Sequence, residues 1–174
     1  MVPEAPLEPT DGGLVPDGEG WFVLNVSDAR WLGGHFGAYT RFEGETRFPK
    51  LGFNIGVLEP GQPACMYHGE DEQEDFLVLS GECLLLIEGR ERQLKAWDFV
   101  HCPAWTEHVF VGAGDGPCAI LMVGARGEGK TLNYPPSEVA ARYGASASEE
   151  TDSGREAYSD WPRNFEQVRA TWPL

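Results

Sequence analysis

The strongest constraint on the fold is a dense series of short apolar segments between residues 63 and 124. Glycine, proline or charged residues bound each of the segments EDFLVLSG, ECLLLIEG, WDFVHCP, EHVFVGA and CAILMVGA. Short strands at this spacing, with no long helical period between them, are typical of an all-β sandwich or closed barrel. We therefore predict an all-β fold, with earlier strands at WFVLNV, AYTRF and FNIGVL.

The chain of 174 residues fits one domain with appendages better than two domains. Residues 1–20 are rich in proline, glycine and acidic residues, which predicts an arm that is disordered or loosely docked. We expect the barrel to occupy residues 21–125. Residues 126–174 should add a short helix at PPSEVAARYG, with Ser137 as its N-cap, and an extended tail. The aromatic side chains of this tail predict that it packs on the barrel or on a partner subunit.

The charge balance argues against two classes of partner. The chain has 28 acidic and 13 basic residues and a net charge of −15, so it should repel nucleic-acid phosphate. No apolar run reaches the about 18 residues of a membrane span. The N-terminal sequence lacks the basic start and apolar stretch of a secretory signal, and we therefore expect no membrane partner and a cytoplasmic location.

The cysteines do not predict a zinc site. They form no closely spaced pair, and three of the four lie in apolar runs (CLLLI, FVHC and CAILMV). In a reducing compartment we expect such residues to be small buried apolar side chains.

The window GQPACMYHGEDEQEDFLVLSG, residues 61–81, carries the chemistry of the chain. If His68 faces inward on a strand, the two-residue alternation of a strand places Glu70 on the same face. After a bend at 71–73, Glu74 returns to the same interior. A different bend would make Gln73 the polar ligand instead, and Glu70 is equally well read as a solvated loop acid.

Two acidic groups inside a barrel require a cation, because each unpaired buried charge costs several kcal/mol. Basic residues are absent between Lys50 and Arg90, so the local sequence offers no partner. A divalent metal ion bound by imidazole and carboxylate groups is the economical answer. His108 could complete the site from a later strand.

These residues resemble the two motifs of the cupin family. The first, G-x5-H-x-H-x3,4-E-x6-G, matches from Gly61 to Gly81, with one extra residue before His68 and with Glu70 in place of the second histidine. The second, G-x5-P-x-G-x2-H-x3-N, matches at Pro103 and His108. Its other positions differ, since Trp97 and Trp105 replace the two glycines and Gly112 replaces the asparagine. The tryptophans imply different turns, indoles at the mouth of the pocket, or packing on surface turns.

The resemblance covers residues 52–124 and implies a double-stranded β-helix, the jelly-roll barrel of the cupins, often as a homodimer. It implies one metal ion near the centre of the barrel, with His68, Glu70, Glu74 and His108 as the ligands. Two histidines and two carboxylates favour Mn, Fe or Zn over copper. If Glu70 does not bind, the remaining two histidines and one carboxylate suit non-haem Fe(II).

Two functions remain open because the fold by itself does not decide between them. The first is a metal-dependent enzyme, similar to a dioxygenase, isomerase or decarboxylase, that acts on a small polar molecule. In it, His101 or Tyr67 would move protons, although a packed side chain is an equally good interpretation of His101 and a better one of Tyr67. The second is a non-catalytic module that binds or senses a small molecule.

Overall fold

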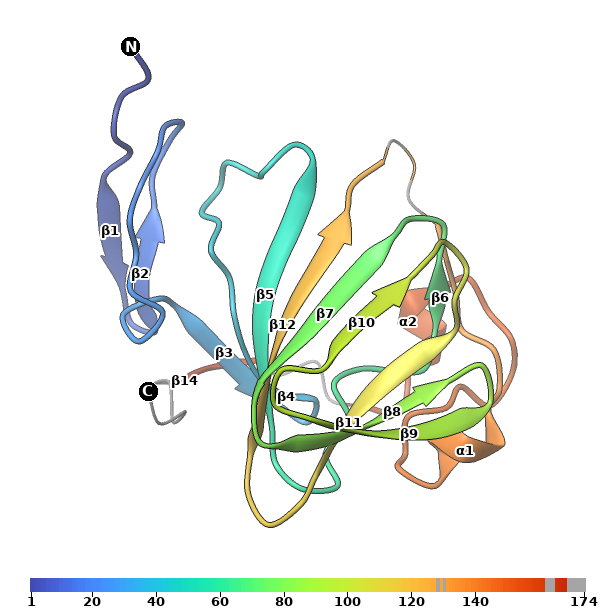
Figure 1. The fold of residues 1–174 in the computed structure, drawn as a ribbon. Helices are drawn as coiled ribbons and strands as arrows, with labels where there is room; N and C mark the ends of the chain where they lie inside the picture. The colour runs from blue at the N-terminus through green and yellow to red at the C-terminus, as the bar shows by residue number, and fades with distance from the viewer. Residues whose placement is uncertain (128, 130, 162–164, 169–174) are drawn as a thin grey trace.

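The computed structural model describes residues 1–161 except 128 and 130, and residues 165–168 (Figure 1). Two sheets face each other and form the body of the molecule, so the predicted all-β fold is confirmed. The larger sheet has the strand order β10-β7-β12-β5-β4-β3-β14, and the smaller has the order β11-β8-β9. The strands of the larger sheet are β3 (Trp31–Gly34), β4 (Gly37–Thr40), β5 (Leu51–Leu58), β7 (Glu74–Ser80), β10 (Phe99–Cys102), β12 (Cys118–Ala125) and β14 (Glu166–Val168). Those of the smaller are β8 (Glu82–Ile87), β9 (Arg90–Lys95) and β11 (His108–Ala113).

The core lies between the two sheets because the strands alternate apolar and polar residues. On β7, Phe76 and Val78 are buried at 4% and 0% exposure, whereas the neighbouring Asp75 points away from the core. Phe110 of β11 and Leu85 of β8 meet them from the smaller sheet. Each such side chain contributes roughly 1.5–3 kcal/mol when fully buried, so this layer fixes which face of each strand points inward.

The N-terminal arm was predicted to be disordered or loosely docked, and the structure shows a docked hairpin. Strands β1 (Leu7–Thr10) and β2 (Gly13–Pro16) form an antiparallel hairpin, which stands beside the barrel on the side opposite to the helices (Figure 1). The Thr10 hydroxyl donates to the Gly13 carbonyl at 2.6 Å across the turn. The amide of Leu14 then donates to the Asp28 carbonyl at 2.7 Å, which ties the hairpin to the following loop. Composition left both states open, and turn and backbone hydrogen bonds decide the structure here.

The described C-terminal segment packs on its own barrel. Helices α1 (Glu138–Ala141) and α2 (Gly154–Ala157) are short, and Ser137 caps α1 as predicted. The amide of Tyr67 donates to the Ala145 carbonyl at 2.6 Å, and the hydroxyl of Tyr158 accepts from the Met66 amide at 3.1 Å. Two further short strands, β6 (Gly69–Glu70) and β13 (Leu132–Asn133), pair with each other. Most of the predicted aromatic tail, residues 162–164 and 169–174, lies outside the described residues.

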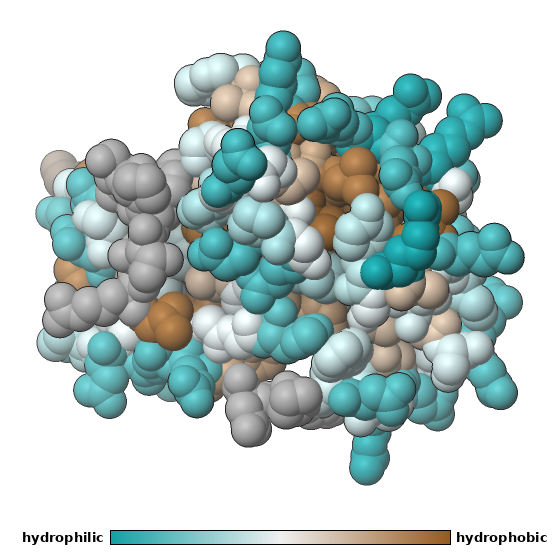
Figure 2. Space-filling model, turned by 90° about the horizontal axis from the view of Figure 1, so that it is seen from below, coloured by the Kyte–Doolittle hydropathy of each residue, from teal (hydrophilic) through white to brown (hydrophobic). Residues whose placement is uncertain are grey.

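The described surface is mixed in polarity. Hydrophilic side chains surround an apolar patch on the face seen from below (Figure 2). No helix in the described part of the chain is both long and apolar enough to cross a membrane. The homodimer and the cytoplasmic location stay predictions.

Trp97 and Trp105 adopt the backbone conformation of the glycines that they replace. Their φ angles are 77° and 66°, and their side chains are 76% and 54% exposed. The expectation that the turns differ is therefore wrong. Neither indole lines the cavity described below, so the expectation that the indoles wall its mouth is wrong too. A non-glycine residue pays roughly 1–2 kcal/mol for this left-handed conformation.

Replacing Trp97 by glycine should therefore stabilise the fold. We expect Trp97→Gly to raise the free energy of unfolding by about 0.5–1 kcal/mol, because relief of the left-handed strain exceeds the entropy cost of a glycine. Denaturant titration would measure the change. Trp21 is the matched control, since it is 51% exposed and is not among the residues with positive φ. Trp21→Gly should destabilise the fold, and an equal loss in both variants would contradict the strain argument.

Candidate metal centre

Two histidines face each other across a short backbone bridge. The amide of His68 donates to the His108 carbonyl at 3.2 Å, and the amide of His108 donates to the His68 carbonyl at 2.8 Å. Residues paired in this way direct their side chains to the same side of the strands. The two imidazole centroids are 5.4 Å apart.

Two carboxylates join these imidazoles. The ligand atoms of His68, Glu70 and Glu74 all lie within 4.8 Å of one another. The Nε2 atom of His108 lies 3.4 Å from Oε2 of Glu74. Glu70 and His108 are only 5% and 3% exposed. The alternation argument therefore placed Glu70 and Glu74 on the correct face of the strands.

The four side chains line a cavity of about 370 Å³ between the two sheets. Phe76, Phe110 and Met122 supply much of its apolar wall. The amide of Trp105 donates to the Glu70 carbonyl at 2.6 Å, so the strained turn of this tryptophan helps to hold Glu70 in place.

Both imidazoles are held in one tautomer by the backbone. Nδ1 of His68 donates to the Met66 carbonyl at 2.8 Å, and Nδ1 of His108 donates to the Thr106 carbonyl at 2.9 Å. A carbonyl oxygen only accepts, so the proton of each neutral ring sits on Nδ1 and Nε2 keeps its lone pair. Burial lowers the pKa of His108, which favours this neutral form. Metal-binding histidines are oriented by hydrogen bonds of this kind.

Glu74 lacks the partner that a buried carboxylate needs. Burial raises its pKa to about 7, and its Oε2 atom has no hydrogen-bond partner among the described residues. Its approach to His108 is not a salt bridge between two charged groups, because burial favours the neutral form of both. A cation in the cavity would keep Glu74 ionised and would suit both nitrogen and oxygen donors. The residues present therefore fit a divalent metal ion.

Two predicted proton carriers lie away from the cavity. Tyr67 is 1% exposed and packs with Leu86 and Val109, and its hydroxyl accepts from the Gly89 amide at 3.2 Å. On β10, His101 lies opposite Asp75 of β7, and its Nδ1 is 2.7 Å from Oδ1 of this residue on the outer face of the sheet. Neither Tyr67 nor His101 is among the residues that line the cavity, and their catalytic roles stay predictions.

Gln73, the alternative ligand, is also directed elsewhere. It is exposed, and its side-chain amide donates to Oδ2 of Asp75 at 2.5 Å. The bend at 71–73 therefore returns Glu74, and not Gln73, to the interior.

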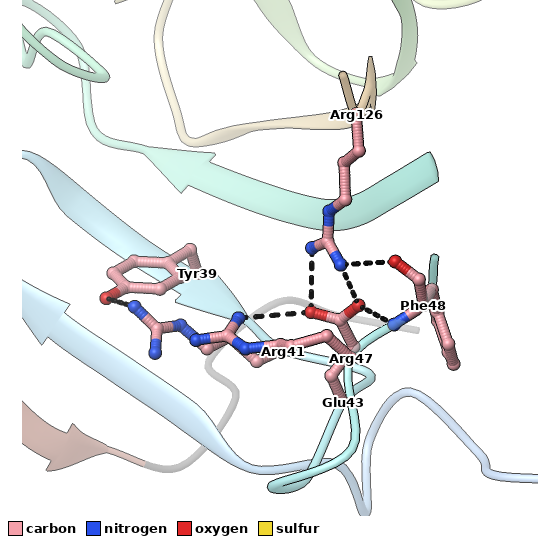
Figure 3. A network of polar contacts seen from close by, with 6 residues as sticks. All are labelled: Tyr39, Arg41, Glu43, Arg47, Phe48 and Arg126. Atoms are coloured by element: carbon pink, nitrogen blue, oxygen red, sulfur yellow. Dashed lines mark hydrogen bonds and ion pairs between the residues drawn. The ribbon is translucent and has the colours of Figure 1, made fainter. Parts of the chain in front are cut away.

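One residue that lines the cavity was not predicted from the sequence. Arg126, directly after β12, lines the cavity and donates to both carboxylate oxygens of Glu43 at 2.7 and 2.9 Å (Figure 3). It also donates to the Phe48 carbonyl at 2.7 Å. The local segment 51–89 contains no arginine or lysine, whereas the sheet brings Arg126 to the cavity from a distant part of the chain.

The Glu43–Arg126 pair lies at the edge of the cavity, which Arg126 lines. Burial works to raise the pKa of Glu43, but hydrogen bonds from Arg126, from the Phe48 amide and from Arg47 outweigh it and hold the pKa below its ordinary value of 4.5. The pair joins the loop between β4 and β5 to the end of β12. It thereby fixes the loop that borders the site.

The comparisons with known proteins agree with this architecture. Residues 54–124 match the family model of the cupin domain. This segment is therefore similar to a cupin domain. A sugar phosphate isomerase from a cupin superfamily, from Silicibacter pomeroyi, is 28% identical to this chain, with a TM-score of 0.50, over 55% of this chain and 62% of that chain. A polyketide cyclase from Streptomyces resistomycificus is 15% identical, with a TM-score of 0.52, over 59% of this chain and 78% of that chain.

A third structure, a proposed sugar phosphate isomerase from Acidithiobacillus ferrooxidans, is 28% identical with a TM-score of 0.47, over 49% of this chain and 56% of that chain. This chain thus matches 56% to 62% of the length of the two isomerase chains. No curated protein sequence matches it. The predicted double-stranded β-helix is confirmed, and the departures from the cupin motifs lie at Glu70, at the two turn tryptophans and at Gly112.

Replacing Glu43 should destabilise the protein in a pH-dependent way. We expect Glu43→Gln to lower the free energy of unfolding by about 1–2 kcal/mol at pH 7, a moderate loss because the Arg126 side chain is 30% exposed. Since the folded pKa of Glu43 lies below 4.5, its contribution is complete above that pH and disappears as the pH falls through the folded pKa.

Denaturant titrations of both proteins across this pH range would measure the difference. Glu45→Gln, an exposed change in the same loop, is the control and should leave stability unchanged. A difference between wild type and Glu43→Gln that stays constant on acidification would contradict the assignment.

Proposed function

We propose that this protein holds one divalent metal ion on His68, Glu70, Glu74 and His108 and is a metal-dependent enzyme acting on a small polar molecule. The observation that carries the proposal is the pair of imidazoles whose Nδ1 atoms are tied to backbone carbonyls beside two buried carboxylates. This arrangement presents nitrogen lone pairs and carboxylate oxygens to one cavity, as a metal requires.

The donor set favours Mn, Fe or Zn. A thiolate ligand does not enter, because burial raises the pKa of Cys65, the cysteine that lines the cavity, to about 12. If Glu70 does not coordinate the ion, the remaining two histidines and Glu74 correspond to the facial triad of non-haem iron sites. A bound ion would supply a Lewis acid, or a redox centre if it is iron.

The rest of the cavity suits a small substrate. Its volume of about 370 Å³ lies at the small end of the range for ligand sites. The apolar wall of Phe76, Phe110 and Met122 would exclude water around the substrate. The similarity to the Silicibacter pomeroyi sugar phosphate isomerase supports an enzyme, and isomerase chemistry within that class.

A binding or sensing module is the second candidate, and one observation favours it. Outside the four proposed ligands, the cavity-lining residues with ionisable side chains are Cys65 and Arg126 among those that the structure describes. Cys65 keeps its proton at neutral pH, and Arg126 is engaged with Glu43. Among the described residues, the cavity therefore provides no general base apart from the proposed ligands. Turnover of a substrate by the metal-loaded protein is the result that would favour the enzyme over the sensor.

Metal analysis tests the site itself. We expect one ion per chain after reconstitution with Mn²⁺, Fe²⁺ or Zn²⁺, measured by elemental analysis after buffer exchange. His68→Ala and His108→Ala should each weaken binding by more than about a hundredfold, since even the loss of a supporting hydrogen bond to a ligand costs 10- to 100-fold. At a free-metal concentration of about 100 times Kd, the ion should stabilise the wild type by about 2.7 kcal/mol.

His101→Ala is the matched control for this experiment. Its imidazole is half exposed on the outer face of the sheet, so the variant should bind metal as the wild type does. A wild type that stays free of metal after reconstitution, or equal losses in the His101 and His108 variants, would overturn the proposed site.

A further inference from the structure

A second pocket adjoins the metal-site cavity. It has a volume of about 250 Å³ and shares Asn54 and Ala64 with the larger cavity as lining residues. A molecule that fills this pocket therefore lies across these two residues from the proposed ligands. Together the two cavities can hold a substrate that is longer than the metal site alone would accept.

Aromatic side chains form most of the wall of the second pocket. The rings of Phe36 and Tyr158 meet edge to face, with centroids 5.2 Å apart, and those of Tyr39 and Phe165 do so at 5.8 Å. Edge-to-face pairs fix the positions of their rings and leave flat apolar surfaces. Such a wall suits the aryl or other apolar body of a ligand.

Arg41 places a positive charge in the same pocket. Its guanidinium donates to the Tyr39 hydroxyl at 3.5 Å, and its Cζ atom lies 5.6 Å from the centroid of the Tyr39 ring. Within the described residues, no carboxylate lies within ion-pair distance of Arg41. Arg47 and Arg126, by contrast, both pair with Glu43 (Figure 3).

Among the described residues, Arg30, Arg90, Arg92 and Arg155 also have no ion pair with a carboxylate. Arg41 differs from them in its place, because it lines an aromatic pocket that adjoins the metal-site cavity. A guanidinium that is partly buried, lies against an aromatic ring and has no carboxylate partner in the described part of the chain is suited to bind an anion from solution.

We propose that this pocket is the substrate subsite and that it binds an organic carboxylate with an apolar body. The carboxylate pairs with Arg41, and the apolar body lies against Phe36, Tyr158 and Phe165. The far end of the substrate then passes Asn54 and reaches the metal-site cavity. The identification of the ligand as substrate rests on the proposed function, whereas binding of the carboxylate does not.

Phenylacetate is the probe for this subsite, and phenylacetamide is its uncharged counterpart of similar shape. Isothermal titration calorimetry would compare their binding to the purified protein before and after treatment with a chelator. We expect phenylacetate to bind about tenfold or more tightly than phenylacetamide in both samples, as a charge-assisted pair predicts. Arg41→Gln should abolish this preference and leave the affinity for phenylacetamide unchanged.

Two further variants separate the charge from the apolar wall. Arg47→Gln removes an exposed guanidinium that does not line the pocket, so the preference for phenylacetate should persist. Phe165→Ala removes a ring that is 57% exposed, which makes misfolding of this variant unexpected, and should weaken both probes by a similar factor.

Three results would overturn the subsite. The first is equal binding of both probes to the wild type. The second is a preference for phenylacetate that survives in Arg41→Gln. The third is a preference for phenylacetate that is lost in His108→Ala but kept in Arg41→Gln, which would place the anion at the proposed ligands. Tighter binding of phenyl phosphate than of phenylacetate would overturn the choice of a carboxylate. If binding depends on Arg41 but the protein takes up no metal, the subsite is supported and the proposed metal enzyme is contradicted. If the protein takes up metal but binding does not depend on Arg41, the metal site is supported and the subsite is contradicted.

Discussion

The rest of this structure depends on two carboxylates and two imidazoles that share one cavity between the sheets. Glu74 has its pKa raised to about 7 by burial, and burial lowers that of His108, so neither neutralises the other as a charged partner. Ionised carboxylates in such a cavity lower the free energy of unfolding unless a cation occupies it. The backbone carbonyls of Met66 and Thr106 prepare the imidazoles for such a cation by holding the protons on Nδ1.

The arginines at the edge of the cavity divide into two roles. The guanidinium of Arg126 donates to Glu43 and to the Phe48 carbonyl, so this residue is part of the scaffold at the edge of the cavity. Arg41 lies in the neighbouring aromatic pocket with the Tyr39 hydroxyl as its polar partner. One guanidinium thus stabilises the loop, and the other gives an acidic protein a local site for an anion.

The turn tryptophans show that a local rule can be overridden. Left-handed backbone normally favours glycine, yet Trp97 and Trp105 hold φ angles of 77° and 66°. At Trp105 the strained turn brings the backbone amide to the Glu70 carbonyl, which links the strain to the position of a proposed ligand. No such link is present at Trp97, whose exposed indole nothing in the structure explains.

Much of the site was accessible from the sequence, because alternation along a strand is a local property. Once His68 was assumed to face inward, Glu70 and Glu74 followed by parity, and the motif spacing indicated His108. The same reasoning did not decide His101, since parity alone does not tell which face of a strand is buried. Pairing with Asp75 turns His101 outward, and this depends on how β10 and β7 align in the sheet. Composition also left open whether the N-terminal arm is disordered or docked, and backbone hydrogen bonds form a hairpin there.

The sequence by itself determined the all-β architecture, the types of the four donor side chains and their common face, because these depend on patterns within a few residues. Only the tertiary structure decided which histidines reach the cavity and where positive charge lies around it. Glu43 and Arg126 are 83 positions apart in the chain, and Arg41 meets a pocket whose walls come from both ends of the sequence. Contacts of this kind arise when the sheets close, and no local pattern encodes them.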